Sequence, residues 1–197
     1  MGQLQSINLQ PFIDKYDLSV FVETGTGIGG SLKEVLKYNF SKYFSIEINK
    51  EVFEMARKAM EWPENVNLIN DTSISGLKSI LSQVSEEVPI LFWLDSHFPG
   101  ADYLPGVSYF ANKDNKEINL PLESELRLIK SMRPNSKDVI ICDDVRIYQD
   151  GDFTEGPWSE RPLMNAGNLD FAGEVFSDSH NLSISLLDQG YLFIEPK

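Results

Sequence analysis

Short apolar stretches alternate with amphipathic stretches along most of the chain. The apolar stretches are short and rich in β-branched and aromatic residues, which is typical of strands, whereas the amphipathic stretches repeat with the period of a helix. Residues 90–94 are apolar throughout, as expected of a central strand that is buried on both faces. We predict strands at residues 18–23, 42–48, 66–70, 89–95 and 138–143, with helices at residues 31–38, 51–60, 74–84 and 122–132.

The C-terminal part of the chain has a different pattern. Residues 181–187 and 191–195 are two further strand-like stretches, and Asp188-Gln189-Gly190 between them is typical of a turn. We therefore predict an α/β fold with a mostly parallel, seven-stranded sheet and a C-terminal antiparallel hairpin. No linker divides the chain, so residues 1–197 are expected to form a single domain. Two long irregular stretches are expected, at about 96–119 and 146–167, and a loop as long as the first is either functional or disordered.

The charge of the chain limits its partners. Lys and Arg total 17 against 30 Asp and Glu, which gives a net charge of −13. Such a surface repels phosphate backbones and anionic lipids, so we expect neither nucleic acid nor a membrane as the main partner. No apolar stretch approaches the ~18 residues that a membrane span needs. Residues 1–6 lack the features of a signal peptide, so a cytoplasmic protein is expected, and a homo-oligomer is left open.

A glycine-rich turn follows the first predicted strand. Gly25, Gly27 and Gly30 have the G-x-G-x-x-G spacing of dinucleotide-binding proteins, and Glu47 lies at the end of the second strand. Glycines at such a turn let the backbone approach a ligand closely. The spacing alone therefore permits a dinucleotide such as NAD as well as other nucleotide-like cofactors.

Acidic residues close three consecutive strands. Glu23, just before the first glycine, would repel a pyrophosphate but favour a ligand with an ammonium group. Glu47 can accept hydrogen bonds from two ribose hydroxyls. Asp71, followed by Thr72 and Ser73, is placed to meet an adenine amino group. Packing does not readily explain this set, although caps of helices are an alternative for Asp71.

These residues resemble the class I S-adenosylmethionine-dependent methyltransferase family. The first motif of that family reads here Val22-Glu23-Thr24-Gly25-Thr26-Gly27-Ile28-Gly29, and the resemblance covers about residues 18–145. It implies a Rossmann-like, doubly wound fold with S-adenosylmethionine as cofactor. The cofactor-binding residues that it implies are Glu23, Thr24, Gly25, Thr26, Gly27, Gly29, Glu47, Ile48, Asp71, Thr72 and Asp95.

Three more carboxylates end the fourth and fifth strands. Asp95 follows one strand, and Asp143 and Asp144 follow its expected neighbour. Carboxylates that converge repel one another unless they are protonated or hold a cation, and oxygen ligands suit Mg²⁺. The pattern is similar to that of metal-dependent sugar O-methyltransferases of the macrocin type, which implies Asp95, Asp143 and Asp144 as magnesium ligands. A solvated strand end is the alternative for Asp143 and Asp144.

One position departs from that second resemblance. The Asp-Gly-Asp sequence of those enzymes is here Asp95-Ser96-His97. Because imidazole titrates near neutral pH, His97 is a candidate general base, although a purely structural histidine is the alternative. Asp95 is the second candidate for removal of the proton.

The expected function follows from both resemblances. We predict methyl transfer from S-adenosylmethionine to a hydroxyl of a small molecule, such as a sugar or a sugar-containing metabolite. Three other functions stay open. One is an NAD-dependent oxidoreductase or epimerase, which predicts a catalytic pair such as Tyr-x-x-x-Lys. The others are a cofactor-binding module without activity and a different chemistry on the same sulfonium cofactor. Aromatic residues of the irregular stretches would cover the site, stack on a sugar ring or serve only in packing: Tyr103, Tyr109, Phe110 and Trp158.

Overall fold

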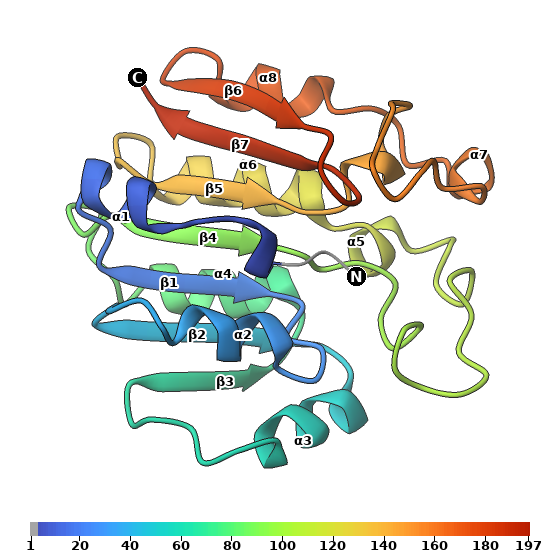
Figure 1. Cartoon of the computed structure of the whole chain (residues 1–197), viewed down its shortest axis with the longest axis horizontal. Helices are drawn as coiled ribbons and strands as arrows, with labels where there is room; N and C mark the ends of the chain where they lie inside the picture. Colours follow the sequence, from blue (N-terminus) through green and yellow to red (C-terminus); the bar gives the residue numbers. More distant parts are fainter. Residues whose placement is uncertain (1–3) are drawn as a thin grey trace.

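A twisted sheet of seven strands runs through the centre of the computed structural model, which describes residues 4–197 (Figure 1). The strand order is β3-β2-β1-β4-β5-β7-β6. Strands β1 to β5 are parallel, whereas β7 is antiparallel to both β5 and β6. The strands are β1 (Val20–Thr24), β2 (Lys42–Glu47), β3 (Val66–Asn70), β4 (Ile90–Leu94), β5 (Val139–Cys142), β6 (His180–Ser185) and β7 (Tyr191–Pro196).

Helices cover both faces of this sheet. One apolar core lies between the sheet and α4, α6 and α8, and a second core lies between the sheet and η1, α1 and α2. The central strand β4 is fully buried because it contributes side chains to both cores. The helices are η1 (Leu4–Ser6), α1 (Gln10–Tyr16), α2 (Gly30–Val35), α3 (Lys50–Lys58), α4 (Ser73–Leu81), α5 (Lys116–Asn119), α6 (Leu122–Met132), η2 (Val145–Ile147), α7 (Arg161–Met164) and α8 (Asp170–Phe176).

The predicted fold class is confirmed, including the mostly parallel sheet and the C-terminal hairpin. The sequence analysis did not predict α1 and α8, which have seven residues each, nor the single-turn helices α5 and α7 inside the irregular stretches. Segments this short contain too few turns for a helical period to stand out. Among the described residues, no helix is long and apolar enough to cross a membrane.

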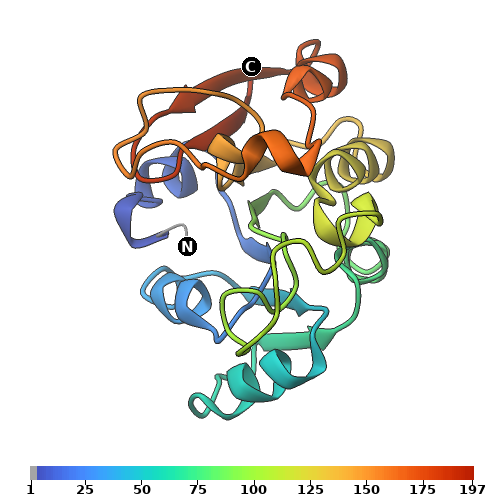
Figure 2. The same ribbon diagram turned by 90° about the vertical axis from the view of Figure 1, so that its right-hand side faces the viewer.

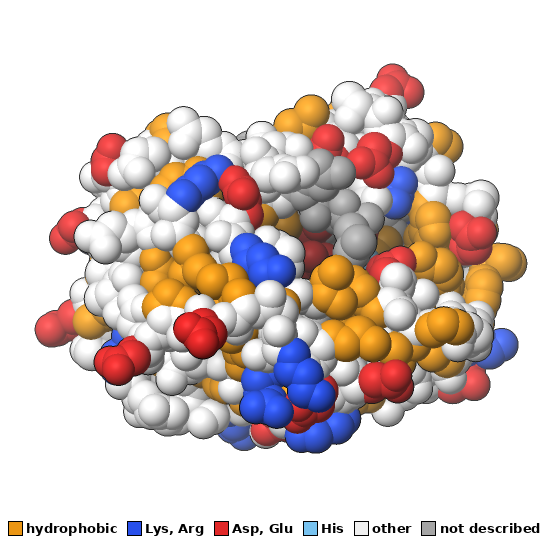
Figure 3. All heavy atoms as spheres, turned by 60° about the horizontal axis from the view of Figure 1, so that its bottom comes forward, with side chains coloured by type: hydrophobic (Ala, Val, Ile, Leu, Met, Phe, Trp, Pro, Cys, Tyr) orange, Lys and Arg blue, Asp and Glu red, His pale blue; other side chains and the backbone are white. Residues whose placement is uncertain are grey.

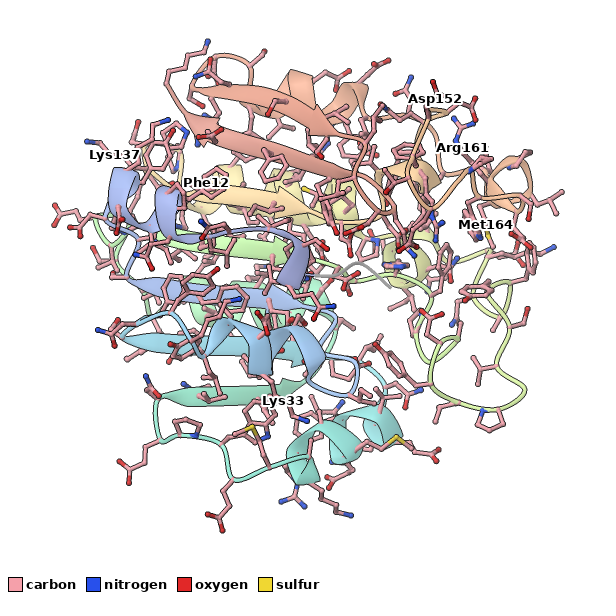
Figure 4. All side chains as sticks on the ribbon, in the orientation of Figure 1. Phe12, Lys33, Lys137, Asp152, Arg161 and Met164 are labelled. Carbon is pink, nitrogen blue, oxygen red and sulfur yellow. The ribbon has the colours of Figure 1, made fainter. Side chains whose placement is uncertain are left out.

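The two ends of the sheet differ in character. At the amino end of β5, Arg133 and Asp138 form a buried, bidentate ion pair with N–O distances of 2.7 and 2.9 Å, and Asp138 also accepts a hydrogen bond from the backbone of Ile90. Both irregular stretches lie at the opposite end, beyond the carboxyl ends of the parallel strands (Figures 1 and 2). Figure 4 shows Lys137 at the first end and Arg161 and Met164 at the second.

Candidate functional site

The glycine-rich turn between β1 and α2 lies between the carboxyl ends of β2 and β4, the two strands that flank β1. Gly25, Gly27 and Gly29 have φ angles of 83, 53 and 84°, in the left-handed region that favours glycine. The backbone N–H of Gly25 donates to the carbonyl of Ile46 at 2.9 Å. A Cβ on Gly25 would overlap the backbone carbonyl of Asp95. The turn therefore needs glycine for a close approach of two backbones.

Gly30 behaves differently from the other three glycines. In a dinucleotide fingerprint the third glycine permits close packing of the helix against a strand. Gly30 is the first residue of α2, and a Cβ at this position would meet nothing within 4 Å. The chain thus has the G-x-G-x-x-G spacing but not the close helix packing for which the third glycine is needed. This difference is evidence against a dinucleotide as the cofactor.

Glu23 lies buried beneath this turn, with no exposed surface. The hydroxyls of Ser31 and Ser45 both donate to its carboxylate. Burial raises the pKa of Glu23 to about 7, although the two serine hydroxyls act in the opposite direction. Sequence reasoning placed Glu23 at the ligand but missed its two hydrogen-bond donors, of which Ser31 also lines the cavity above the turn.

Two cavities open above the turn and share Gly25, Asp95 and Tyr103. The larger measures about 290 Å³, and the smaller, of about 40 Å³, also contacts Glu47, Ile48 and His97. The larger is close to the ~300 Å³ at which small-molecule pockets begin. A Cβ on Gly27 would overlap the Tyr103 phenol, so this ring lies directly on the turn. The larger cavity is lined by Leu4, Gln5, Gly25, Thr26, Ile28, Gly30, Ser31, Glu34, Asp95 and Tyr103.

Glu47 and Asp71 lie in different settings. Glu47 accepts hydrogen bonds from the backbone N–H of Gly27 at 3.0 Å and of Asn49 at 2.8 Å, and burial raises its pKa. Asp71 accepts hydrogen bonds from the Thr72 backbone and from the Ser75 hydroxyl, both at 2.8 Å, at the start of α4. Thr24 is fully buried on β1. Glu47 thus borders the smaller cavity, whereas Thr24, Asp71 and Thr72 line neither of these two cavities.

Three titratable side chains meet where β4 and β5 end. The His97 Nε2 lies 2.8 Å from an oxygen of Asp144, and its Nδ1 lies 3.4 Å from an oxygen of Asp95. Within residues 4–197, Asp95, His97 and Asp144 form the group whose ligand atoms lie within 4.8 Å of one another. Asp143 lies outside this group; its Oδ1 accepts a hydrogen bond from the Asp144 backbone at 2.8 Å, and its Oδ2 is buried without a hydrogen-bond partner in the described residues. The structure therefore brings together two of the three predicted metal ligands, with His97 beside them.

The charges of this group depend on one another. Burial alone would lower the pKa of His97, but the negative charge and hydrogen bond of Asp144 raise it to about 10. Burial and the charge of Asp143 hold the pKa of Asp95 well above its ordinary value, and burial and Asp144 raise that of Asp143 to about 8. These contacts favour the imidazolium form of His97, which does not accept a proton. Its role as a general base stays a prediction.

Comparison with known proteins identifies the fold. No family model matches the chain. The structure is similar to that of the S-adenosylhomocysteine-bound methyltransferase PaMTH1 of Podospora anserina, with a TM-score of 0.62 and 18% identity. The match covers 94% of this chain and 75% of PaMTH1. A protein assigned as a caffeoyl-CoA O-methyltransferase from Staphylococcus aureus gives a TM-score of 0.61 and 13% identity over 100% and 85% of the two chains. The chain has the class I methyltransferase fold.

One curated sequence also matches. It is the ribosomal RNA small subunit methyltransferase A of Caldanaerobacter subterraneus subsp. tengcongensis, 34% identical over 82 residues. The match spans 42% of this chain and only 26% of that enzyme. It supports the class I methyltransferase fold in the part that is aligned.

Aromatic side chains of both irregular stretches meet beside the His97 group of this methyltransferase fold. The ring of Phe98 lies 5.4 Å from that of Tyr109 and 5.1 Å from that of Trp158. They border a third cavity, of about 50 Å³, which also contacts His97 and Asp144. Phe110 instead packs against the core, and Tyr103 lies on the glycine turn. Two of the four predicted aromatic residues, Tyr109 and Trp158, therefore border this third cavity.

The alternative of an NAD-dependent oxidoreductase requires a Tyr-x-x-x-Lys pair, and two pairs have that spacing. Tyr38 is buried, and its hydroxyl accepts a hydrogen bond from the Leu9 backbone, while Lys42 begins β2 at the end of the sheet opposite the cavities. Tyr109, paired in sequence with Lys113, donates to Asp102, which raises the pKa of Tyr109 to about 12. A tyrosine base needs a lowered pKa, so neither pair supports that function.

Glu125 on α6 is a buried carboxylate that the sequence pattern did not reveal. It has no exposed surface, and neither of its oxygens accepts a well-formed hydrogen bond in the described part of the chain. The hydroxyls of Ser73 and Thr24 lie near enough to oppose the effect of burial on its pKa. Burial raises its pKa to about 7. An acid whose pKa rises on folding destabilises the folded protein at any pH above its pKa in the unfolded chain, here near 4.5. The loss of stability grows with pH until the pH exceeds the pKa in the folded protein.

Replacement of Glu125 by glutamine is therefore expected to raise the free energy of unfolding at pH 8 by about 1–3 kcal/mol. At pH 4.5 most of this gain should disappear, because Glu125 is then largely protonated in the folded protein. Urea unfolding at both pH values measures the difference, with Glu123→Gln on the same helix as control. Equal effects of Glu125→Gln at the two pH values would contradict the prediction.

Proposed function

We propose that this protein is an S-adenosylmethionine-dependent methyltransferase that methylates a hydroxyl of a small molecule, such as a sugar or a sugar-containing metabolite. The observation that carries the proposal is the pair of cavities above the glycine turn, with Glu23 buried beneath them and Asp95 shared between them. The likeness to a methyltransferase with bound S-adenosylhomocysteine supports the choice of cofactor.

The proposed cofactor position uses residues on both sides of the turn. The amino-acid end of S-adenosylmethionine would occupy the larger cavity, where Ser31 links it to the Glu23 carboxylate. The ribose would approach Glu47, which faces the smaller cavity. A ligand that spans both cavities passes Tyr103, so this ring would cover the cofactor and exclude water. Asp71 and Thr72 stay predicted contacts of the adenine, and they would have to leave their bonds at the start of α4.

The proposed chemistry is direct transfer of the methyl group. The acceptor oxygen attacks the methyl carbon in line, the carbon–sulfur bond breaks, and S-adenosylhomocysteine leaves. Asp95 takes the hydroxyl proton in its ionised form, because it borders both cavities and the charge of the neighbouring His97 favours the carboxylate. The His97 imidazolium holds Asp95 and Asp144 in place. Alignment and exclusion of water would supply most of the acceleration.

A divalent metal ion at this site stays a prediction. The atoms that converge include a histidine nitrogen, whereas Mg²⁺ prefers oxygen ligands in an octahedral arrangement. A set of two carboxylates and one imidazole suits Mn²⁺ or Fe²⁺ better. Any metal bound by His97 must first displace the proton that Asp144 retains there. The described donors therefore do not fit the predicted magnesium site, and the proposed mechanism uses no metal.

A small acceptor is proposed in preference to a nucleic acid. The chain carries a net charge of −13. On the face in Figure 3, Lys and Arg appear in small groups beside Asp and Glu. On α3, for example, Lys50 and Arg57 lie 3.4 and 2.9 Å from Glu54. Charges that are already paired attract phosphates weakly.

Calorimetric titration tests the cofactor directly. We expect S-adenosylmethionine and S-adenosylhomocysteine to bind the wild-type protein in a one-to-one ratio, and NAD to give no heat of binding. Binding of NAD without a response to S-adenosylhomocysteine would exclude the proposal. Binding of S-adenosylmethionine with no methyl transfer to any hydroxyl compound would instead identify a cofactor-binding module without activity.

A further inference from the structure

Tyr103 lies in the first irregular stretch, and its ring rests directly on the glycine turn. A Cβ built on Gly27 would overlap the Tyr103 hydroxyl oxygen and would lie 2.5 Å from the ring carbon that carries it. Carbon atoms in contact lie about 3.5–4.0 Å apart, so no layer of ligand atoms fits between this ring and the turn. A cofactor that crosses the turn at Gly27 therefore needs the space that the ring occupies.

The same ring stands between the two cavities above the turn. Gly25, Asp95 and Tyr103 border both cavities. Gly25 follows β1 and Asp95 follows β4, and their backbones are in contact, because a Cβ on Gly25 would overlap the Asp95 carbonyl. Of the three shared residues, only Tyr103 lies away from a strand end, on a long loop. A ligand that fills both cavities must therefore displace the Tyr103 ring.

The smaller cavity is too small for the ribose and adenine that we assign to it. It measures about 40 Å³, whereas pockets for small molecules begin at ~300 Å³. Burial and the charges of Asp95, Asp102 and Glu47 raise the pKa of Tyr103, because its hydroxyl lies among these carboxylates. The phenol thus occupies part of the space beside Glu47. Its removal would enlarge the smaller cavity and join it to the larger one.

The loop around Tyr103 is held together by bonds of its own. The backbone N–H groups of Tyr103 and Leu104 both donate to the Gly100 carbonyl, at 3.1 and 2.9 Å. The N–H of Val107 donates to the Leu104 carbonyl at 3.2 Å. These bonds stay intact when the loop moves as a unit. Gly100 and Gly106 flank Tyr103 with φ angles of 80°, and glycine accepts large changes of backbone angle at a hinge.

We propose that Tyr103 is a gate that blocks the cofactor site of the ligand-free protein. The loop between Gly100 and Gly106 moves outward, S-adenosylmethionine enters across the glycine turn, and the ring then closes over the cofactor instead of over Gly27. The inference rests on the proposed function and adds a step to it. Because a minor open state is typically about 0.1–10% populated, opening limits how fast the cofactor binds.

The kinetics of S-adenosylhomocysteine binding test the gate. Stopped-flow tryptophan fluorescence follows binding, because the Trp62 ring lies against the same turn, 3.0 Å from a Cβ built on Gly29. Tyr103→Ala removes the ring, and Tyr103→Phe keeps it. Tyr16→Ala is the matched control, since the Tyr16 hydroxyl donates to Glu195 at the opposite end of the sheet (Figure 1).

We expect the association rate constant to rise about tenfold or more in Tyr103→Ala, because the ligand no longer waits for the open state. In Tyr103→Phe and Tyr16→Ala it should stay within about twofold of wild type. An unchanged association rate constant in Tyr103→Ala, whatever happens to dissociation, would refute the gate and leave the proposed function standing. Absence of binding to all four proteins would instead refute the proposed function, and the gate with it.

A second measurement needs no ligand. In Gly27→Ala the new Cβ takes the space of the Tyr103 ring, whereas in the double variant with Tyr103→Ala only the strain of an alanine at a φ of 53° remains. Thermal unfolding is followed by circular dichroism. We expect Gly27→Ala to lower the Tm by at least about 3 °C more in the wild-type background than in the Tyr103→Ala background. Equal losses would show that the ring does not rest on the turn, which would overturn the gate.

Discussion

Replacement of Asp144 by asparagine is expected to lower the pKa of His97 from about 10 toward its ordinary value of 6.5. Burial favours the neutral imidazole, and the Asp144 carboxylate at 2.8 Å is the main group that opposes burial. Asparagine is the right substitute, because Asp144 has a φ of 55° and asparagine tolerates this left-handed conformation. The change thus removes the charge and leaves the backbone unstrained.

NMR of the histidine rings measures this result without any substrate. The chain has two histidines, and burial lowers the pKa of the other, His180. Wild type should therefore show one titration near pH 10 and one below 6.5, and Asp144→Asn should shift only the first. Asp17→Asn is the matched control, because Asp17 is exposed and has a φ of 53°. A His97 titration that stays near pH 10 in Asp144→Asn would contradict the described ion pair.

The same pair gives the wild-type protein a stability that depends on pH. The pKa of His97 is higher in the folded protein than in the unfolded chain, so its contribution is complete below about pH 6.5 and is lost as the pH rises to about 10. Each unit corresponds to about 1.4 kcal/mol, so the total amounts to several kcal/mol. Urea unfolding between these pH values should show a decline in wild type that is much smaller in Asp144→Asn.

Methyl transfer should respond to the same substitution. If the His97 imidazolium orients Asp95 as the proton acceptor, Asp144→Asn should reduce turnover by about 10²–10⁴-fold with little change in S-adenosylhomocysteine affinity. Assays with and without a chelator separate this effect from loss of a metal ligand. Turnover that falls in wild type when the chelator is added would support the metal site and count against the proposed mechanism.

The sequence predicted the fold well because strands and long helices have local patterns. Strand β4 is apolar throughout since both of its faces are buried, and α6 shows its period over eleven residues, so its predicted range agrees with the structure. Helices α1 and α8 lacked such a pattern. Each has seven residues, and their stability comes from packing against distant parts of the chain, such as the stacking of Phe12 on Phe193.

The site was predictable only as far as strand ends define it. Position after a strand was enough to place Asp95, Asp144, Glu47 and the glycine turn at one edge of the sheet. It could not show which of two consecutive aspartates faces His97, because that depends on the left-handed backbone of Asp144. Glu125 could not be predicted for another reason. Its importance lies in the burial of its carboxylate, which only the packed structure reveals.

Replacement of Gly25 by alanine is expected to reduce the affinity for S-adenosylhomocysteine by about 100-fold or more and the free energy of unfolding by about 2–4 kcal/mol. Gly25 has a φ of 83°, and an added Cβ would overlap the carbonyl of Asp95. The backbone of β4 must then move away from that of β1. Both cavities above the turn are bordered by these two residues, so the displacement changes the proposed cofactor site itself.

A second glycine distinguishes the effect of backbone strain from that of steric overlap. Gly167 has a φ of 82°, but a Cβ there would meet nothing within 4 Å. Gly167→Ala should therefore cost only about 1–2 kcal/mol, the penalty for a left-handed alanine, and leave ligand affinity unchanged. Urea unfolding and calorimetric titration, at a temperature where circular dichroism shows both variants folded, give the two quantities. If folded Gly25→Ala bound S-adenosylhomocysteine as tightly as Gly167→Ala, the ligand would lie away from the turn. A cofactor on this turn would lose contacts when Asp95 shifts.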